Sequence, residues 1–168
     1  GYTNITHSIN FYYKSAERFQ EASEIFSSSP AFAVFGQEMA AAGAEPYYHN
    51  LTSYLIAEGD GRGANFGVTF VSEVSNPVVY FNAFKKMSAK MFKESFGGEA
   101  YVLRQQHTGW GNVTQSVSVY FNSNAEALDF LANYINTPQF AEFVEEAGTT
   151  FKPVRTYMEQ ALLQYNPD

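Results

Sequence analysis

The sequence repeats itself, and this repeat constrains the fold more than any other feature. Residues 1–40, moved along the chain by 108 positions, align with residues 109–148 without a gap. The identical pairs include Gly1 and Gly109, Asn4 and Asn112, Thr6 and Thr114, Ser8 and Ser116, Tyr12 and Tyr120, Pro30 and Pro138, and Phe35 and Phe143. Self-similarity at a fixed spacing is typical of a duplicated structural unit. We therefore predict two copies of one unit in this chain.

Each aligned copy is predicted to be a strand, a helix and a strand. Residues 113–121 alternate between apolar and mainly hydroxyl-bearing side chains, the period of a strand with one buried face. The aligned residues 5–13 alternate in the same way and are predicted to form a strand as well. A helical region is expected over 124–147, restarted at Thr137-Pro138. The closing strands are expected near 47–57 and 153–163.

The second copy is predicted to be complete and the first incomplete. The glycine-rich residues 59–64 are interpreted as a linker, followed by a strand over 65–74, a helix over 77–94 and a strand over 99–107. Residues 65–168 then form β-α-β-β-α-β, the ferredoxin-like arrangement of the α+β class, with an antiparallel sheet and helices on one face. Residues 1–58 carry only the last β-α-β. We expect a missing β-α-β before Gly1, either because the chain is a fragment, which is the favoured reading, or because a neighbouring molecule completes the sheet. The whole chain is expected to form one compact unit.

The second copy also resembles the dimeric α+β barrel superfamily. The resemblance rests on the segment Tyr101 to His107, the turn Thr108-Gly109, the strand Ser116 to Phe121, the Thr137-Pro138-x-Phe140 restart, and the closing run Pro153 to Tyr157. In that superfamily two such units press their open sheet faces together into a barrel, from two chains or from one duplicated chain. The resemblance therefore implies a homo-oligomer, at least a dimer, with the Thr/Ser/Tyr face lining the barrel. The superfamily includes cofactor-free monooxygenases, isomerases, cyclases and haem-dependent enzymes, so fold alone does not choose a function.

Composition excludes several classes of function. The formal net charge is -7 and the Lys and Arg residues are scattered, which argues against binding nucleic acid. The absence of cysteine excludes disulfides and thiolate nucleophiles. No apolar run approaches the roughly 20 residues that span a bilayer, so a soluble protein without a membrane partner is expected. Cytoplasm and bacterial periplasm both stay open as compartments.

His107 is the candidate catalytic residue. It ends the 99–107 strand near a hairpin, where a histidine could act as a general base because its pKa lies near working pH. The resemblance also allows a haem ligand there, although no cofactor is indicated. The alternative is a hairpin-end histidine in solvent. No metal site is expected, since His7, His49 and His107 do not stand at metal-ligand spacing.

A second group of polar and aromatic residues is the candidate ligand-binding site. Its members are Tyr12, Ser116, Ser118, Tyr120, Arg155 and Tyr157. Arginine beside tyrosine can orient an anionic or phenolic molecule. The alternative is that Arg155 pairs with a carboxylate at the sheet edge. The alternation places His107 and Arg104 on opposite faces, so the two should not act together.

Two functions follow as hypotheses. The first is an uncharacterised, oligomerising module that binds a small organic ligand. The alternative is a cofactor-free monooxygenase-like or isomerase-like enzyme acting on a small organic molecule through His107. The absence of any paired catalytic constellation favours the first.

Overall fold

The chain forms two compact units, Gly1–His49 and Asn50–Asp168. The computed structural model describes residues 5–46, 49–94, 97–109 and 111–164. The division differs from the single compact unit expected from the sequence. Each unit is described here by itself.

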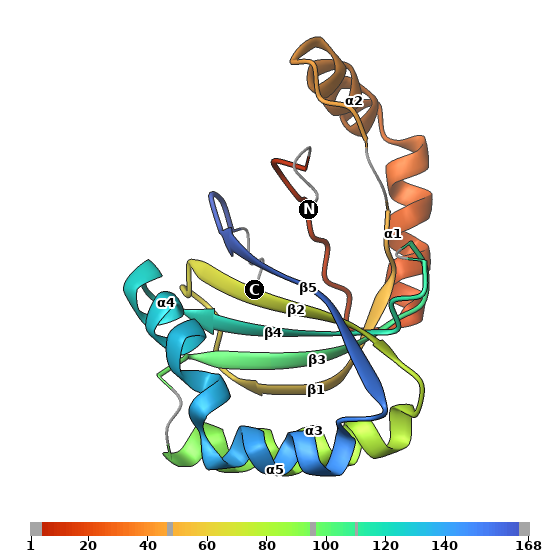
Figure 1. Cartoon of the computed structure of the whole chain (residues 1–168). Helices are drawn as coiled ribbons and strands as arrows, with labels where there is room; N and C mark the ends of the chain where they lie inside the picture. The colour runs from red at the N-terminus through yellow and green to blue at the C-terminus, as the bar shows by residue number, and fades with distance from the viewer. Residues whose placement is uncertain (1–4, 47–48, 95–96, 110, 165–168) are drawn as a thin grey trace. The chain divides into compact units, whose positions relative to one another are not determined.

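The second unit is a five-stranded antiparallel sheet with helices (Figure 1). Its strands are β1 (Thr52–Gly59), β2 (Phe66–Val74), β3 (Ala100–Gln106), β4 (Gln115–Phe121) and β5 (Phe151–Gln160). Its helices are α3 (Pro77–Glu94), α4 (Asn124–Asn133), the short 3-10 turn η1 (Tyr134–Asn136) and α5 (Pro138–Ala147). The strand order is β1-β3-β4-β2-β5, and α3 and α5 lie together on one face of the sheet. Without β1, this is the predicted β-α-β-β-α-β arrangement.

Strand β1 joins the sheet as an extra edge strand. It pairs antiparallel with β3, from Thr52 opposite Gln106 to Gly59 opposite Ala100. The contact boundary therefore lies after His49, whereas the sequence analysis placed this strand in the first copy, ending at residue 58. Residues 59–64 form a short hydrogen-bonded connection, in which Asp60 pairs with Arg62.

The two faces of the sheet differ as the alternation predicts. On the helix-facing side, Leu103 stands opposite Val117 and Val68 opposite Val119, and all four are buried. Aromatic rings from α3 and α5 complete this core, with Phe143 against Tyr80 at a centroid distance of 5.5 Å. On the other side, serine, threonine, tyrosine and arginine side chains alternate with the core residues.

Helix starts are set by local sequence. Ser123 caps α4 in a capping box, accepting from the Glu126 backbone while the Glu126 carboxylate accepts from the Ser123 backbone. Thr137 caps α5, and Pro138 occupies the first turn. Salt bridges from Lys86 to Glu146 and from Lys90 to Glu142 join α3 to α5 on their exposed side.

The first unit contains two helices, α1 (Ala16–Ser28) and α2 (Pro30–Ala41). The strand predicted over 5–13 was wrong, because these residues, all within the described part of the chain, form no strand. A strand is stabilised by a ladder of hydrogen bonds to a neighbour and by burial of one face. No described segment pairs with 5–13, and both Ile9 and Phe11 are exposed. Alternation alone therefore did not produce the strand.

Candidate functional site

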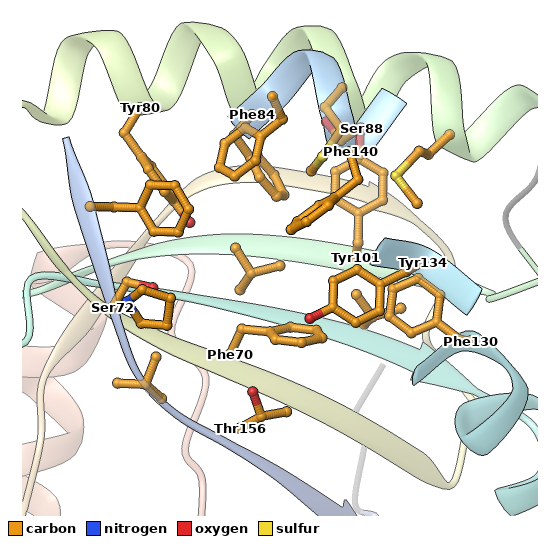
Figure 2. Close-up of a pocket in the computed structure, with 18 of the residues that line it drawn as sticks. Phe70, Ser72, Tyr80, Phe84, Ser88, Tyr101, Phe130, Tyr134, Phe140 and Thr156 are labelled. Carbon is orange, nitrogen blue, oxygen red and sulfur yellow. The ribbon is translucent and has the colours of Figure 1, made fainter. Parts of the chain in front are cut away.

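A cavity of about 150 Å³ lies between the sheet and the helices of the second unit (Figure 2). Its wall is mainly aromatic and aliphatic, and most of the aromatic side chains come from α3, from the η1 region and from α5. The lining residues include Phe70, Tyr80, Phe84, Met87, Met91, Phe92, Tyr101, Val117, Val119, Phe130, Tyr134, Phe140, Phe143 and Phe151. An apolar cavity of this size is large enough for a benzene-sized molecule.

Helix periodicity brings the α3 residues into the cavity. Tyr80, Phe84, Met87 and Met91 follow the i, i+4, i+7, i+11 spacing of one helix face, so they all point toward the sheet. The break between α4 and α5 likewise turns aromatic side chains of η1 and α5 toward the cavity. There Tyr134 of η1 stacks edge-on against Phe140 with centroids 5.1 Å apart, and both rings line the cavity.

Two phenol–hydroxyl pairs supply polar groups to this apolar cavity. The Tyr80 hydroxyl lies within hydrogen-bonding reach of Ser72, and the Tyr101 hydroxyl lies within reach of Ser88. Burial raises the pKa of Tyr80 to about 12, although its bond to Ser72 acts in the opposite direction. Burial also raises the pKa of Tyr101. Both phenols therefore stay neutral, and they can orient a ligand by hydrogen bonding rather than by charge.

Of the predicted ligand-binding residues, Arg155 is the one that lines this cavity. Thr156 and Pro153, its neighbours on β5, line it too. The Arg155 guanidinium carbon lies 5.5 Å from the centroid of the Tyr157 ring, within the range of a cation–π contact. Tyr157 stands opposite Thr69, whose hydroxyl bonds Ser118 on the hydroxyl-rich face, so the guanidinium over the Tyr157 ring lies on that face and not in the cavity.

The predicted serine and tyrosine residues lie instead in a hydrogen-bonded network on the opposite face of the sheet. Arg104 donates from Nη1 to Ser118 Oγ over 2.6 Å and from Nη2 to Tyr120 Oη over 2.6 Å. Ser118 Oγ also lies 2.7 Å from Thr69 Oγ1. Nearby on the same face, Gln106 donates from Nε2 to Ser116 Oγ over 2.8 Å. These hydroxyls satisfy one another's hydrogen bonds.

A half-buried carboxyl group borders this network. Glu159 on β5 and Tyr120 on β4 both stand opposite Gly67 of β2. A Cβ at Gly67 would lie 3.1 Å from the Glu159 Cγ, so glycine leaves the room that this side chain uses. Burial raises the pKa of Glu159, although the charge of Arg104 acts to lower it.

His107 lies away from both groups. It follows the end of β3, is exposed, and its Nε2 lies 2.9 Å from Ser53 Oγ. Its backbone N–H donates to the carbonyl of Leu51 over 2.8 Å. It is not among the residues that line the cavity, nor is it bonded to Arg104. Tyr12 belongs to the first unit, where its side chain is exposed.

Four hydroxyl-bearing residues of the cavity were not predicted as site residues from the sequence: Ser72, Tyr80, Ser88 and Tyr101. They carry a signal that could have been used, because hydroxyl groups interrupt otherwise apolar stripes. Ser88 follows Phe84 by four residues on the inner face of α3 and is buried. A buried hydroxyl needs a hydrogen-bond partner, and a phenol on a facing strand is one.

No group of three or more His, Asp or Glu side chains in the described part of the chain is placed to hold a metal ion. Among the described helices, none combines the length and the apolar character that crossing a bilayer requires.

Comparison with known proteins locates the fold but not the activity. No family model and no curated protein matches the sequence. A structure from Fusobacterium nucleatum, named as a proposed monooxygenase, is 12% identical over 88% of this chain and 64% of its own, with a TM-score of 0.56. An anthrone oxidase-like protein is 13% identical over 90% of this chain and 74% of its own, with a TM-score of 0.50. The chain shares the ferredoxin-like fold of these structures.

These likenesses extend to the fold alone, because the identities are low. A ferredoxin-fold protein of Listeria monocytogenes, described as uncharacterized and related to antibiotic biosynthesis monooxygenases, is 14% identical over 72% of this chain, with a TM-score of 0.44. The chain spans less than two thirds of the Fusobacterium protein. A shared fold at these identities therefore does not establish a shared activity.

Proposed function

We propose that the chain binds a small, uncharged aromatic molecule in the cavity between its sheet and α3 and α5. The observation that carries this proposal is the cavity itself, about 150 Å³ inside an aromatic core. Protein cores are close-packed, and residual cavities cost about 24 cal/mol per Å³. A ligand that fills this cavity recovers much of that energy.

The wall defines the chemistry of the ligand. Flat aromatic rings from several elements favour a flat aromatic guest, through stacked and edge-on contacts. The neutral hydroxyls of Tyr80 and Tyr101 favour one or two hydrogen-bonding groups on it, such as a phenol or a ketone.

We further propose that the protein acts as a homo-oligomer, at least a dimer. The sheet face opposite the helices carries the Arg104, Ser118 and Tyr120 network, whose groups are already paired with each other. Polar groups that are satisfied within one chain can be buried against a second chain at little cost. Native mass spectrometry of the purified protein measures both the number of chains and any ligand that remains bound.

A cofactor-free monooxygenase-like activity is the second candidate. It is supported by the names of the two structures with TM-scores of 0.56 and 0.50 and by the neutral phenols of the cavity. The balanced reaction would convert the CH2 group of an anthrone-like substrate and one O2 into a ketone and one water. His107 lies outside the cavity lining, so this candidate would use Tyr80 or Tyr101 to orient the substrate. Oxygen consumption with anthrone, measured for the parent and for Tyr101→Phe, tests it.

A thermal-shift titration with phenol tests ligand binding. Phenol should raise the Tm of the parent saturably, because a ligand at 100 times its Kd stabilises by about 2.7 kcal/mol. Val117→Phe fills the cavity from the sheet side and should abolish this rise. Val78→Phe makes the same substitution at an exposed position of α3 and should keep it. An equal rise in the parent and both variants would mean that phenol binds elsewhere, and the proposal would fail.

A further inference from the structure

The helix pair of the first unit is built on the same local plan as α4 and α5 of the second. Ser15 caps α1 by accepting from the Arg18 backbone, as its aligned residue Ser123 caps α4. Ser29 caps α2 by accepting from the Phe32 backbone, as Thr137 caps α5 through Phe140. The repeat in sequence is therefore also a repeat in helix architecture.

The aromatic rings of the two helix pairs are spaced alike, although Phe26 and Phe32 are stacked at 15° whereas Tyr134 and Phe140 meet edge-on at 78°. Phe26 and Phe32 have ring centroids 4.8 Å apart, and the aligned Tyr134 and Phe140 are 5.1 Å apart. Phe32 and Phe35 are 5.9 Å apart, and the aligned Phe140 and Phe143 are 6.0 Å apart. The first unit thus carries an aromatic ridge with similar ring spacings. We call the residues Phe19, Phe26, Phe32, Phe35 and Met39 the α1–α2 ridge.

What differs is burial. Phe143 is 4% exposed, whereas the aligned Phe35 of the α1–α2 ridge is 40% exposed. Ala147 is fully buried, whereas the aligned Met39 is 37% exposed. No residue of either α1 or α2 is buried. Large exposed apolar surfaces of this kind indicate an interaction site.

The second unit shows what covers such a ridge. Phe143 packs on Tyr80 and Phe84 of α3, with centroids 5.5 Å and 6.5 Å away, and on Phe151 of β5, 5.2 Å away. Salt bridges flank this contact, from Lys86 to Glu146 and from Lys90 to Glu142. The layer that covers Phe143 is thus formed by α3 and β5, and Phe70 of β2 packs on the neighbouring Tyr134 at 5.1 Å. In the chain, α3 is carried between β2 and β3.

We propose that the α1–α2 ridge is a docking surface for a partner's β-α-β segment of the same kind as residues 66–106. The partner helix carries aromatic side chains toward Phe32 and Phe35. It carries a lysine or arginine opposite Glu38, because Glu38 aligns with the Glu146 that binds Lys86. Val34 aligns with Glu142, the residue that pairs with Lys90 of α3. The partner helix therefore carries an apolar residue at the position that corresponds to Lys90.

Other occupants fit less well. A second copy of this chain offers a β-α-β segment whose helix-facing side is already covered by its own α5, so docking there would expose as much apolar surface as it buries. A membrane surface would attract basic residues around the ridge. Helix α1 instead carries Glu17, Glu21 and Glu24 against one arginine, Arg18.

A fusion that supplies such a segment tests the proposal. Because Gly1 aligns with Gly109, residues 65–108 of this chain are placed directly before Gly1 of the full chain. Hydrogen exchange of the amides of residues 32–39 should slow at least 100-fold in the fusion compared with the unmodified chain. The control fusion carries Tyr80→Asp and Phe84→Asp in the added segment only, and should leave that exchange fast. Equal exchange in all three proteins would overturn the proposal.

Co-expression of the full chain with a separate polypeptide of residues 65–108 tests the same contact without a covalent fusion. The tagged full chain should capture a separate polypeptide of residues 65–108, and Phe35→Asp in the ridge should lower the captured amount at least tenfold. Ile25→Asp is the matched control, since Ile25 is exposed but aligns with the exposed Asn133, and capture should persist. The proposal fails if Phe35→Asp leaves capture unchanged. It also fails if Phe35→Asp splits a dimer of the unmodified chain, or removes binding to phosphatidylcholine vesicles, because the occupant is then a second copy or a membrane.

Discussion

Replacing Phe143 by alanine removes the ring at the centre of the contact between α5, α3 and β5. The ring is 4% exposed and lies within 6.5 Å, centroid to centroid, of Tyr80, Phe84, Phe140 and Phe151. Phe→Ala substitutions in cores cost about 3–5 kcal/mol, through lost transfer energy and the new cavity. The upper part of that range is expected, because the site adjoins an existing cavity and its neighbours are themselves rigid rings.

The matched substitution is Phe35→Ala, at the aligned position of the first unit. There the ring is 40% exposed, so the loss should stay below about 1 kcal/mol. Urea unfolding followed by circular dichroism measures both free energies of unfolding. With a total stability of about 5–15 kcal/mol, Phe143→Ala should also lower Tm by roughly 10–20 °C.

Equal losses in the two variants would refute the reasoning, since burial would then not decide the energy. A changed urea m-value in Phe143→Ala would point instead to a change in the unfolded or native ensemble. Phe143→Leu separates the two parts of the effect, because it keeps most of the apolar volume and should recover more than half of the loss.

Three further predictions concern single groups. Burial raises the pKa of Glu159 above its usual 4.5, so the charged form of this carboxyl is disfavoured in the folded protein. The contribution of Glu159 to the free energy of unfolding is therefore fully present below about pH 4.5 and is lost as the pH rises through the raised pKa. Glu159→Gln should therefore raise Tm at neutral pH and change it little near pH 4 in thermal scans. Arg104→Met should cost about 1–3 kcal/mol in urea unfolding, since it removes the hydrogen bonds to Ser118 and Tyr120, and Arg104→Lys should recover only part of this. Ser123→Ala should lower the free energy of unfolding by about 1 kcal/mol, because it removes the capping box of α4. Ser123→Asp should retain most of the stability of the unmodified chain, because aspartate also caps helices. An unchanged urea midpoint in the alanine variant would contradict the capping role.

Local signals in the sequence predicted the helices and most of the strands. The helix predicted over 77–94 is the one that α3 forms as Pro77–Glu94. Thr137-Pro138 predicted the restart that begins α5, and Pro30, which aligns with Pro138, begins α2 in the same way. Such signals suffice because helix hydrogen bonds and caps join residues close in sequence.

The strand predicted over 5–13 shows the limit of local signals. Its alternation matches that of 113–121, which forms β4 between β3 and β2. Strand hydrogen bonds join residues far apart in sequence, so the same pattern gives a strand only where a neighbour is present. The same reasoning applies to β1, which was predicted as part of the first copy. It forms a strand of the second unit because it finds its hydrogen-bond partner in β3.

The candidate site could not be derived from the sequence for a related reason. The cavity is enclosed by residues of β2, α3, β3, β4, α4, η1, α5 and β5, and no local pattern says which of their side chains leave space between them. The polar residues that looked functional, Ser116, Ser118 and Tyr120, bond within a network on the other face. Arg155 alone among the predicted residues lines the cavity.

The sequence by itself determined that the chain is a duplicated α+β protein, with helices capped at definite residues and a sheet with one apolar and one hydroxyl-rich face. These features depend on the period of side chains along each element and on contacts within a turn or two. Tertiary structure decided which copy acquires a sheet, where β1 pairs and where the aromatic rings leave a cavity. Each of these depends on the packing of segments distant in sequence, whose free energy no single segment contains.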